Sequence, residues 1–364
     1  METKKIKVIT YHISKSTSVG GIQRLVRHIQ NLELGHNFDF IEAYNDVPNM
    51  EINGDNPKVE YNKIFSGQKS KNPLTKIWER IAVYCYFVKK KYRGGIILVF
   101  HPEHLALIPR STLRKNKIIL VQANRFDKLF ERIGKLAFEL NKEHVDFFSV
   151  YTEYDLNFIK EHYPSLVNKT RVIPRGCRIP TGAIKSKMTY KLVTICRIYE
   201  RQKNLTSMLN IVNGLPDEYT LDIYGIGAKH EMDSLLTMID SKKVKFKGEA
   251  KDVAAILEDY SVFLMTSHYE GFGQTLIEAR SQGLPIVAYN TFDALTWIVQ
   301  DGVNGKVVPY KDENAFSNAI QQILSDESIY LEYSKNSIDM AKSTELSRVS
   351  EQLKNMIISA AELD

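Results

Sequence analysis

Short runs of apolar, β-forming residues alternate with longer segments of helical periodicity along almost the whole chain. Strands that alternate with helices are typical of α/β units built on parallel sheets. The series restarts after residues 174–182, a stretch rich in proline, glycine and basic residues that is typical of a hinge. The pattern therefore predicts two doubly wound α/β domains. The expected strands are residues 5–10, 39–43, 96–100, 117–122, 147–150, 171–173, 192–195, 220–224, 244–246, 262–265, 286–288 and 306–308.

The length agrees with this prediction, because 364 residues are many for one hydrophobic core. We expect an N-terminal Rossmann-like domain over residues 1–176 and a C-terminal Rossmann-like domain over residues 177–340. Residues 341–364 have a helical pattern, and we expect them to pack back on the N-terminal domain. Ligands of open parallel sheets bind beyond the carboxyl ends of the strands. The two domains are therefore expected to face each other across a cleft that holds the ligand.

The charge of the chain is unevenly distributed. Residues 1–176 contain 29 Lys and Arg against 18 Asp and Glu, a net charge of +11, whereas residues 177–364 contain 20 against 25, a net charge of −5. A basic half suits anionic lipid, nucleic acid or a phosphate-rich polymer, although scattered lysines are also ordinary solvated surface. No helix-turn-helix or aromatic-basic pattern supports nucleic acid, so no nucleic-acid partner is expected.

The densest basic run, residues 89–93, ends an amphipathic segment that begins at Pro73. A basic cap on a helix C-terminus also complements the helix dipole, so this run has an ordinary structural explanation as well. Apolar residues recur in the segment at helical spacing: Leu74, Ile77, Trp78, Ile81, Ala82, Tyr84, Cys85 and Val88.

Composition indicates an ordinary globular protein, with 43% hydrophobic and 25% charged residues. The first residues lead directly into a strand, so no signal peptide is expected. Cys85, Cys177 and Cys196 have no metal or redox spacing. We therefore expect a cytoplasmic protein, with peripheral contact at the inner membrane face through the basic N-terminal domain as a hypothesis from charge.

The most informative motif is a pair of glutamates eight residues apart, Glu270 and Glu278, with Gly271 and Gly273 between them. The motif lies between an expected strand and an expected helix that stops at Gly283. Glycines at such a turn let backbone N–H groups approach a ligand, and the helix N-terminus adds a positive dipole. Carboxylates bind hydroxyls and the turn suits phosphate, so the combination fits a nucleotide sugar.

Two further features suit a diphosphate. Gly20 and Gly21 open an expected helix after the first strand, although a glycine pair is also an ordinary tight turn. Arg197 and Lys203 follow another strand and would neutralise a diphosphate leaving group, although isolated basic residues are usually surface charges. Arg201 lies in the same loop, and the sequence alone does not separate it from these two.

Three candidates lie at other strand ends. Gly227 ends a Tyr-Gly-Ile-Gly motif that brings backbone close to a ligand or merely turns the chain. His101 and Asn124 follow two strands of the N-terminal domain and are candidates for the acceptor side, although a lone His at a strand end is more often structural. No D-x-D motif and no cluster with metal-ligand spacing occurs, so no metal or other cofactor is expected.

In combination these motifs resemble the retaining family 4 glycosyltransferases of GT-B fold. The resemblance covers nearly the whole chain and is strongest over residues 192–324. It departs from the family at residues 122–124, where many members have a His and this chain has Gln-Ala-Asn. The residues that carry it are, in chain order, Gly20 with Gly21, Arg197 with Lys203, the motif ending at Gly227, and residues 270–278.

The resemblance implies a nucleotide-sugar donor held mainly by the C-terminal domain, metal-independent transfer and retained anomeric configuration. Glu278 would bind the ribose hydroxyls and Glu270 the donor sugar. Arg197 and Lys203 would hold the diphosphate, and the Gly21 N–H would contact it from the other domain. The other implied donor-site residues are glycines and turn residues: Gly20, Gly227, Gly271, Phe272, Gly273, Gln274 and Thr275.

The sequence thus predicts a glycosyltransferase that moves a hexose or N-acetylhexosamine from a UDP-sugar. The expected acceptor is a cell-envelope glycan, a lipid-linked glycan or an anionic polymer. Two alternatives stay open at this point. One is a non-catalytic, glycosyltransferase-like partner subunit, and the other is a protein O-glycosyltransferase with a Ser/Thr-rich acceptor.

Overall fold

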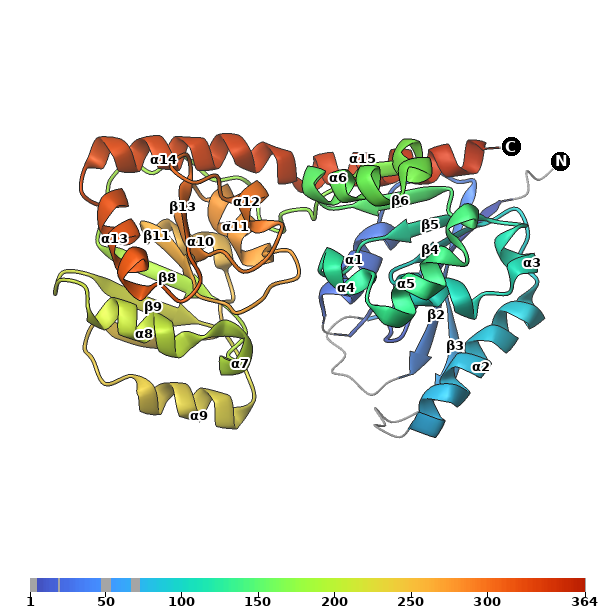
Figure 1. The fold of residues 1–364 in the computed structure, drawn as a ribbon, viewed down its shortest axis with the longest axis horizontal. Coiled ribbons are helices and arrows are strands. Elements are labelled where there is room, and N and C mark those ends of the chain that lie inside the picture. The colour runs from blue at the N-terminus through green and yellow to red at the C-terminus, as the bar shows by residue number, and fades with distance from the viewer. Residues whose placement is uncertain (1–4, 19, 47–53, 67–72, 364) are drawn as a thin grey trace. The chain divides into compact units, whose positions relative to one another are not determined.

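The computed structural model describes residues 5–18, 20–46, 54–66 and 73–363. The chain divides into two compact units, each an α/β domain (Figure 1). Unit 1 consists of Met1–Pro174 and Val349–Asp364, and unit 2 of Arg175–Arg348. The division follows Pro174 rather than residue 176. Residues 341–348 belong to unit 2, so only the later part of the expected C-terminal segment lies in unit 1.

Unit 1 is built on a parallel sheet in which seven strands are described, in the order β3-β2-β1-β4-β5-β6-β7. The order of the strands reverses between β1 and β4, which pair directly. The strands are β1 (Ile6–His12), β2 (Phe38–Asp46), β3 (Val59–Ser66), β4 (Ile96–Val99), β5 (Lys117–Val121), β6 (Phe147–Val150) and β7 (Thr170–Val172).

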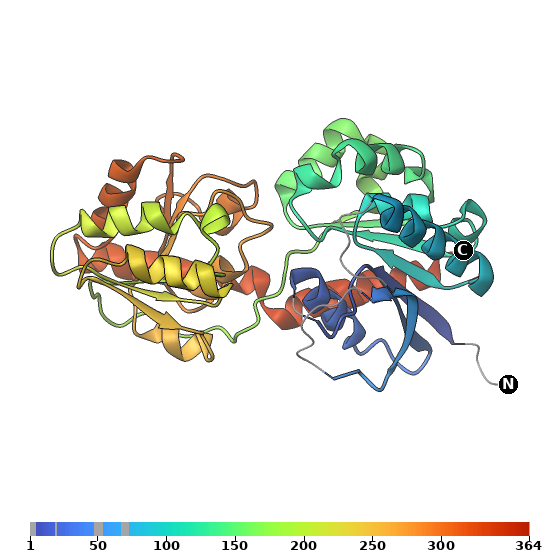
Figure 2. The same ribbon diagram turned by 90° about the horizontal axis from the view of Figure 1, so that it is seen from below.

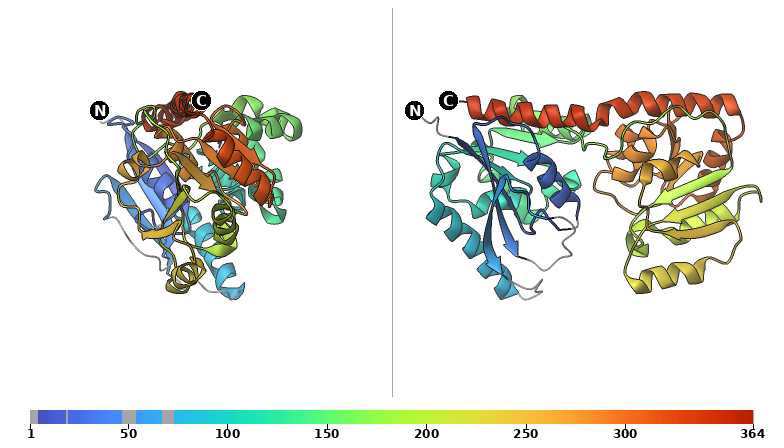
Figure 3. Two further views of the ribbon diagram at one scale, coloured as in Figure 1. Left: turned by 90° about the vertical axis from the view of Figure 1, so that its left-hand side faces the viewer. Right: turned by 180° about the vertical axis from the view of Figure 1, so that it is seen from behind.

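Helices cover both faces of this sheet (Figure 2). Because successive strand residues point to opposite faces, Val8 of β1 packs with α1 and α15, whereas Ile9 packs with α2, α5 and α6. The C-terminal helix α15 lies along the first of these faces (Figure 3). The helices of unit 1 are α1 (Gly21–Gln30), α2 (Pro73–Lys90), η1 (Pro102–Leu107), α3 (Arg110–Leu113), α4 (Phe126–Leu129), α5 (Arg132–Glu139), η2 (Lys142–His144), α6 (Glu153–His162), η3 (Pro164–Lys169) and α15 (Leu346–Glu362).

Unit 2 repeats the same plan with six described strands in the order β10-β9-β8-β11-β12-β13. These are β8 (Lys191–Ile195), β9 (Thr220–Tyr224), β10 (Val244–Gly248), β11 (Val262–Met265), β12 (Ile286–Tyr289) and β13 (Gly305–Val308). The helices are α7 (Glu200–Lys203), α8 (Leu205–Asn213), α9 (Lys229–Met238), α10 (Val253–Glu258), α11 (Gln274–Ser281), α12 (Leu295–Ile298), α13 (Glu313–Ile323), α14 (Glu327–Ala341) and η4 (Lys342–Thr344).

Among the described strands, β3 is the one that the sequence pattern does not predict. It forms the edge of the described sheet in unit 1, and its polar residues Glu60, Lys63 and Ser66 are exposed. An edge strand needs less apolar surface than a central one, because only one side is paired. Its sequence, VEYNKIFS, therefore lacks the continuous apolar run that marks the other strands.

The described helices include none that is both long enough and apolar enough to cross a bilayer.

Candidate functional site

The sheet of unit 2 reverses its strand order between β8 and β11, which pair through Leu192 and Val193. In doubly wound sheets the carboxyl ends of strands at such a reversal form the usual ligand site. The segments that follow these two strands carry Arg197, Lys203 and Glu270. The topology therefore brings three of the sequence-predicted donor residues to one edge of one sheet.

The glycine turn between β11 and α11 has the backbone conformation that the motif requires. Gly273 is the N-cap of α11 and has φ 91°, in the left-handed region. A Cβ at this position would lie 3.1–3.3 Å from carbons of Phe292, Leu276 and Ile298. Phe272 is buried against Trp297, with ring centroids 6.1 Å apart, so its side chain belongs to the core and only its backbone is offered to a ligand.

Lys203 and Glu270 form a close ion pair at this edge. Lys203 Nζ lies 2.5 Å from Glu270 Oε1, and each side chain is 13% exposed. Together with Cys196 and Thr275 they line a void of about 10 Å³, too small for a ligand. Burial raises the pKa of the Cys196 thiol to about 11, so this residue is a neutral member of the group.

Backbone and side-chain hydrogen bonds hold the two loops of this pair together. Thr266 Oγ1 donates to the carbonyl oxygens of Lys203 and Asn204, at 3.1 and 2.9 Å. The Asn204 amide donates back to Thr266 O at 3.2 Å, and the His268 N–H donates to Gln202 O at 2.8 Å. The position of Lys203 relative to Glu270 is thus fixed by the fold, and does not depend on the ion pair alone.

Glu278 lies in α11 and is 2% exposed. Its Oε1 accepts from Arg178 Nε at 2.5 Å. Its Oε2 is buried and has no hydrogen-bond partner among the described residues. Burial raises the pKa of Glu278 above its ordinary value, against the opposing effect of the Arg178 charge. A buried carboxylate oxygen without a donor is costly, which makes Oε2 a natural acceptor for a ligand hydroxyl.

Arg178 is a site residue that the sequence reasoning missed. It lies in the stretch interpreted as a hinge, one hundred positions from its partner Glu278. The Gln274 side chain also contacts this stretch, donating from Nε2 to Gly176 O at 3.0 Å. A basic residue in a segment rich in Pro and Gly was the available signal, but nothing local indicates its partner.

The Tyr-Gly-Ile-Gly motif packs against the chain that follows β8. A Cβ on Gly225 would lie 1.8 Å from Cys196 O, and one on Gly227 would lie 2.1 Å from Ile198 O. Both glycines are therefore required by close backbone approach, whether or not Gly227 also contacts a donor. Arg197 lies in the chain between Cys196 and Ile198, and its side chain is exposed.

In unit 1 the two glycines begin α1, with Gly20 as its N-cap. The loop before them is anchored on Glu42 of β2, which is fully buried. Glu42 accepts from the Ser16 N–H at 2.6 Å, from Ser16 Oγ at 2.5 Å and from Gln30 Nε2 at 2.6 Å. Burial nevertheless raises the pKa of Glu42 above its ordinary value. The sequence reasoning missed this carboxylate as well.

His101 and Asn124 follow the neighbouring strands β4 and β5, so they lie at the carboxyl edge of unit 1 as expected. His101 is the N-cap of η1 and contacts His104 within that helix, with ring centroids 5.3 Å apart. Burial lowers the pKa of both histidines. Gln122, in the 122–124 segment that has no His, is buried and donates from Nε2 to Asn124 O at 3.2 Å. It also accepts from the Tyr151 N–H at 2.8 Å, so its role in the turn is structural.

A cavity of about 420 Å³ lies at this edge of unit 1, between α2, η1 and α5. Two buried polar atoms of its lining residues, Asn45 Oδ1 and His104 Nδ1, have no hydrogen-bond partner among the described residues. Neither His101 nor Asn124 lines it. The lining residues are Tyr11, Ile13, Asn45, Lys76, Glu79, Arg80, Glu103, His104, Ala106, Leu107 and Ile133.

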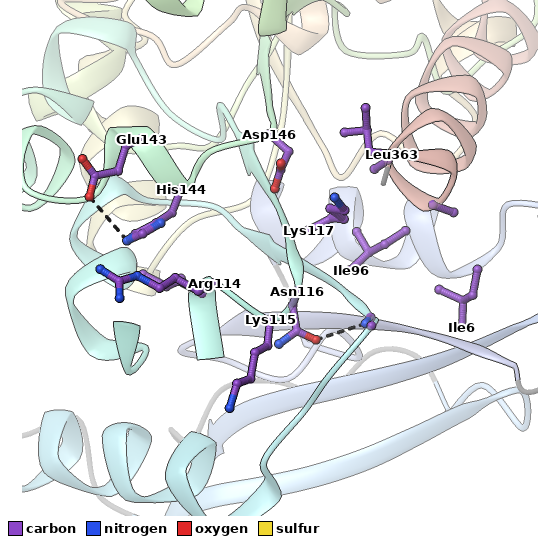
Figure 4. Close-up of a pocket in the computed structure, with 15 residues that line it drawn as sticks. Ile6, Ile96, Arg114, Lys115, Asn116, Lys117, Glu143, His144, Asp146 and Leu363 are labelled. Atoms are coloured by element: carbon purple, nitrogen blue, oxygen red, sulfur yellow. Dashed lines mark hydrogen bonds and ion pairs between the residues drawn. The ribbon is translucent and has the colours of Figure 1, made fainter. Parts of the chain in front are cut away.

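A second cavity, of about 500 Å³, lies at the opposite edge of the same sheet (Figure 4). Its walls include Ile6, Ile96 and Lys117, which are at the amino ends of β1, β4 and β5. The Gly95 N–H donates there to Asn116 Oδ1 at 3.1 Å. Since ligands of doubly wound sheets bind at the carboxyl ends, this cavity is not the candidate site.

Within the described parts of the chain, no group of three or more His, Cys, Asp or Glu side chains is arranged to hold a metal ion.

Residues 189–326 match the family model described as glycosyl transferases group 1. This segment contains Arg197, Lys203, Glu270 and Glu278 of the unit 2 site, whereas Arg178 precedes it. The match excludes unit 1 and therefore bears on the donor-side residues only.

Curated relatives agree with this family. The chain is 28% identical over 235 residues to the GtfA subunit of UDP-N-acetylglucosamine–peptide N-acetylglucosaminyltransferase from Streptococcus pneumoniae, covering 60% of this chain and 42% of that protein. It is 22% identical over 308 residues to poly(glycerol-phosphate) alpha-glucosyltransferase from Bacillus subtilis, covering 84% of this chain and 40% of the relative. The chain thus spans less than half the length of these relatives.

Solved structures show the same fold over the whole chain. The pneumococcal O-GlcNAc transferase GtfA, in complex with UDP and GlcNAc, matches with a TM-score of 0.68 at 14% identity, over 98% of this chain and 99% of that one. Sucrose-phosphate synthase from Thermosynechococcus elongatus matches with a TM-score of 0.74 at 17% identity, over 98% and 99%. The fold is therefore GT-B, with two Rossmann-like domains.

Proposed function

We propose that this chain is a retaining, metal-independent glycosyltransferase of family 4 that transfers a hexose or N-acetylhexosamine from a UDP-sugar. The observation that carries the proposal is Glu278: a buried carboxylate with one oxygen unsatisfied, at the ligand-binding edge of a group 1 glycosyltransferase region. The Lys203–Glu270 pair at the same edge adds a cation and a second carboxylate.

Glu278 would bind the nucleoside. The ribose 2′- and 3′-hydroxyls would donate to Glu278, with Oε2 receiving the bond that it lacks in the protein alone. Arg178 donates to Oε1 and opposes the rise in the pKa of Glu278, which favours Oε2 as an acceptor. A UDP donor is supported by the pneumococcal GtfA structure, which contains UDP and GlcNAc.

Lys203 and Arg197 would hold the diphosphate, with the backbone amides of Phe272, Gly273, Gln274 and Thr275 at the α11 N-terminus. Glu270 would accept from sugar hydroxyls while Lys203 neutralises the charge that develops on the leaving phosphate. Gly20, Gly21 and Gly227 remain proposed donor contacts through their backbone.

In the proposed retaining step, the sugar C1–O bond to the diphosphate breaks while the acceptor oxygen bonds to C1 on the same face. The acceptor proton passes to the departing phosphate oxygen, so the protein supplies no base. No metal ion or other cofactor is proposed, because the cationic side chains meet the phosphate charge.

On the acceptor side we propose the cavity lined by Asn45 and His104, which offers two unsatisfied polar atoms to hydroxyls. Lys76 and Arg80 line it together with Glu79 and Glu103, so its charged residues offer both donors and acceptors to a glycan. The predicted residues His101 and Asn124 would act at its margin. A cell-envelope glycan, lipid-linked or anionic polymer acceptor is supported by the names of relatives, which include a lipopolysaccharide core glycosyltransferase from Rhizobium meliloti and a capsular polysaccharide glycosyltransferase from Staphylococcus aureus.

The test is nucleotide release from a panel of UDP-, GDP- and ADP-sugars without added acceptor. We expect slow hydrolysis of one UDP-sugar that Glu270→Ala and Arg197→Ala each reduce by about 100-fold. The matched control is Arg201→Ala, because Arg201 is exposed in the same loop and has no proposed role. Equal loss in the control variant would contradict the assignment of Arg197.

The main alternative is a non-catalytic partner subunit. The relevant observation is that the pneumococcal relative is named as a subunit, and that a GtfA/B complex is among the similar structures. Calorimetry separates the two functions: no turnover and no binding of any nucleotide sugar would favour the partner role. A protein O-glycosyltransferase would instead hydrolyse the same donor and transfer to a Ser/Thr-rich peptide rather than to a glycan.

A further inference from the structure

Helix α2 presents an apolar stripe to solvent. Ile77 is 50% exposed, Trp78 62%, Ile81 43%, Tyr84 48% and Val88 47%. These residues recur at intervals of one, three and four positions, so they form one face of the helix. We call them the α2 stripe. They belong to the set that the sequence pattern picks out as amphipathic.

The stripe is not needed to attach α2 to the protein. Val83 and Phe87 are fully buried on the other face and join the core cluster that contains Ile9 and Ile97. The helix therefore has two apolar faces, one packed on the sheet and one exposed. A contiguous apolar patch of this kind usually marks an interaction surface, because it costs solvation free energy in water.

The surroundings of the stripe are basic. Glu79 is the single acidic residue in the α2 sequence. The exposed cations on α2 and just beyond its C-terminus are Lys76, Arg80, Lys89, Lys90, Lys91 and Arg93. One of these, Lys90, forms an ion pair with Glu60: its Nζ lies 3.7 Å from Glu60 Oε1. Lys76 and Arg80 line the unit 1 cavity with Glu79, so the cations placed to meet an anionic surface are Lys89, Lys91 and Arg93.

We propose that the α2 stripe inserts into the interface of an anionic lipid bilayer, with α2 parallel to the membrane plane. Tryptophan and tyrosine with flanking Lys and Arg are the residues that suit the boundary between headgroups and acyl chains. The charge complements an anionic lipid surface, which attracts such cations over about 10 Å. A helix that lies in the interface need not span the bilayer.

Membrane docking would also narrow the class of acceptor, an inference that rests on the proposed function. Lys76, Glu79 and Arg80 of the same helix line the proposed acceptor cavity. These three residues lie on the side of α2 that carries the buried Val83 and Phe87, so a bilayer seated on the stripe would be one helix diameter, about 10 Å, from the cavity. The acceptor class that fits is a glycan carried on a membrane lipid, rather than one free in solution.

The chain offers a direct reporter, because Trp78 and Trp297 are its two tryptophans. In the Trp297→Phe variant Trp78 is the single tryptophan, so the tryptophan emission reports on it alone. We expect its emission to shift to shorter wavelength with vesicles of phosphatidylcholine and phosphatidylglycerol in equal amounts. Pure phosphatidylcholine vesicles should give a much smaller shift, and about 0.5 M salt should weaken the response to the anionic vesicles.

Cosedimentation of the full chain with the same vesicles tests the stripe itself. The combined variant Ile77→Ser, Trp78→Ser, Ile81→Ser removes exposed apolar groups only, and we expect it to lower the bound-to-free ratio by about tenfold or more. Its matched control is Leu236→Ser with Ile329→Ser, which removes exposed apolar residues of unit 2 (54% and 40%) and should leave binding unchanged.

The contribution of charge is tested by Lys89→Ser, Lys91→Ser, Arg93→Ser, which should weaken binding to the anionic vesicles only. Its control replaces exposed lysines of unit 2: Lys242, Lys245 and Lys251.

Three results would overturn the proposal. One is an unshifted Trp78 spectrum with anionic vesicles. Another is equal vesicle binding by the stripe variant and the wild type. The third is light scattering that shows a dimer of the wild type and a monomer of the stripe variant, which would make the stripe an interface between copies. Nucleotide release from a soluble donor should be the same in wild type and stripe variant, so failure of the docking is distinguishable from failure of the proposed activity.

Discussion

The ion pair of Arg178 and Glu278 is asymmetric, and this asymmetry leads to a quantitative prediction. The Glu278 side chain is 2% exposed, whereas the Arg178 side chain is 38% exposed. Removing the arginine leaves a carboxylate that water does not reach. Removing the carboxylate charge leaves a guanidinium that turns to solvent. Arg178→Gln should therefore destabilise unit 2 more than Glu278→Gln does.

The magnitude follows from the geometry. At 2.5 Å and an effective dielectric constant of about 20, Coulomb's law gives roughly 7 kcal/mol before any desolvation is counted. Breaking a fully buried pair costs about 3–5 kcal/mol, and an exposed pair about 0–1 kcal/mol. Because Arg178 is partly exposed, we expect about 2 kcal/mol for Arg178→Gln and about 1 kcal/mol or less for Glu278→Gln.

The penalty depends on pH in a defined direction. Burial already raises the pKa of Glu278 in the folded protein above its unfolded value, so the protonated form is favoured by folding. Stability from this group is present below the unfolded pKa and is lost as pH rises through the folded pKa. Arg178→Gln removes the charge that opposes this shift. The destabilisation by Arg178→Gln should thus be large at pH 8 and shrink toward pH 5.

The assay follows urea unfolding by the fluorescence of Trp297 in a Trp78→Phe background, so that unit 2 alone is reported. Arg178→Gln and Glu278→Gln are each compared with this background at pH 8 and pH 5.5. The double variant should recover part of the loss, because no buried charge remains. An equal penalty for Arg178→Gln at the two pH values, or a larger penalty for Glu278→Gln, would refute the reasoning.

Three other predictions concern single positions. Burial lowers the pKa of His12 to about 4, so the folded protein holds it neutral. The free energy of unfolding of unit 1 should therefore fall by roughly 3 kcal/mol as pH decreases from about 6.5 through about 4. His12→Gln should flatten this pH profile when unfolding is followed by circular dichroism. Gly273→Ala should cost about 1–3 kcal/mol in thermal unfolding of unit 2, read by Trp297, because φ is 91° and three carbons lie within 3.3 Å. Glu42→Gln should cost about 2 kcal/mol and make the loop at Ser16 more accessible to proteolysis, because an amide nitrogen would then face hydrogen-bond donors.

Much of the fold is predictable because buried parallel strands are read from continuous apolar runs. β11 and β12 are each buried at every position, and the sequence pattern locates both within one residue. The pattern does not predict β3, because an edge strand exposes polar residues and so lacks a continuous apolar run. In α2 the spacing predicts the helix but not its inward face. The core residues are Val83 and Phe87, and the more prominent apolar stripe faces solvent.

The candidate site is predictable where a short motif carries it. Glu270 and Gly273 are found from local spacing, and the structure gives Gly273 the left-handed conformation that a glycine turn requires. Arg178 and Glu42 are not found, because their role depends on partners distant in the chain. The place of His101 after a strand makes it the predicted histidine, yet it is His104 that lines the cavity of unit 1.

Helix α11 connects the candidate site to the segments through which the chain enters and leaves unit 2. Glu278 binds Arg178 in the entering segment. Two positions later Arg280, 1% exposed, donates to Thr344 Oγ1 in the leaving segment at 3.0 Å, and the Cys177 N–H donates to Thr344 O at 2.7 Å. Burial lowers the pKa of Arg280 to about 10, so its charge is retained at neutral pH. Glu278 and Arg280 thus connect α11 to both segments, and a ligand hydroxyl on Glu278 would bind at one of these two connections.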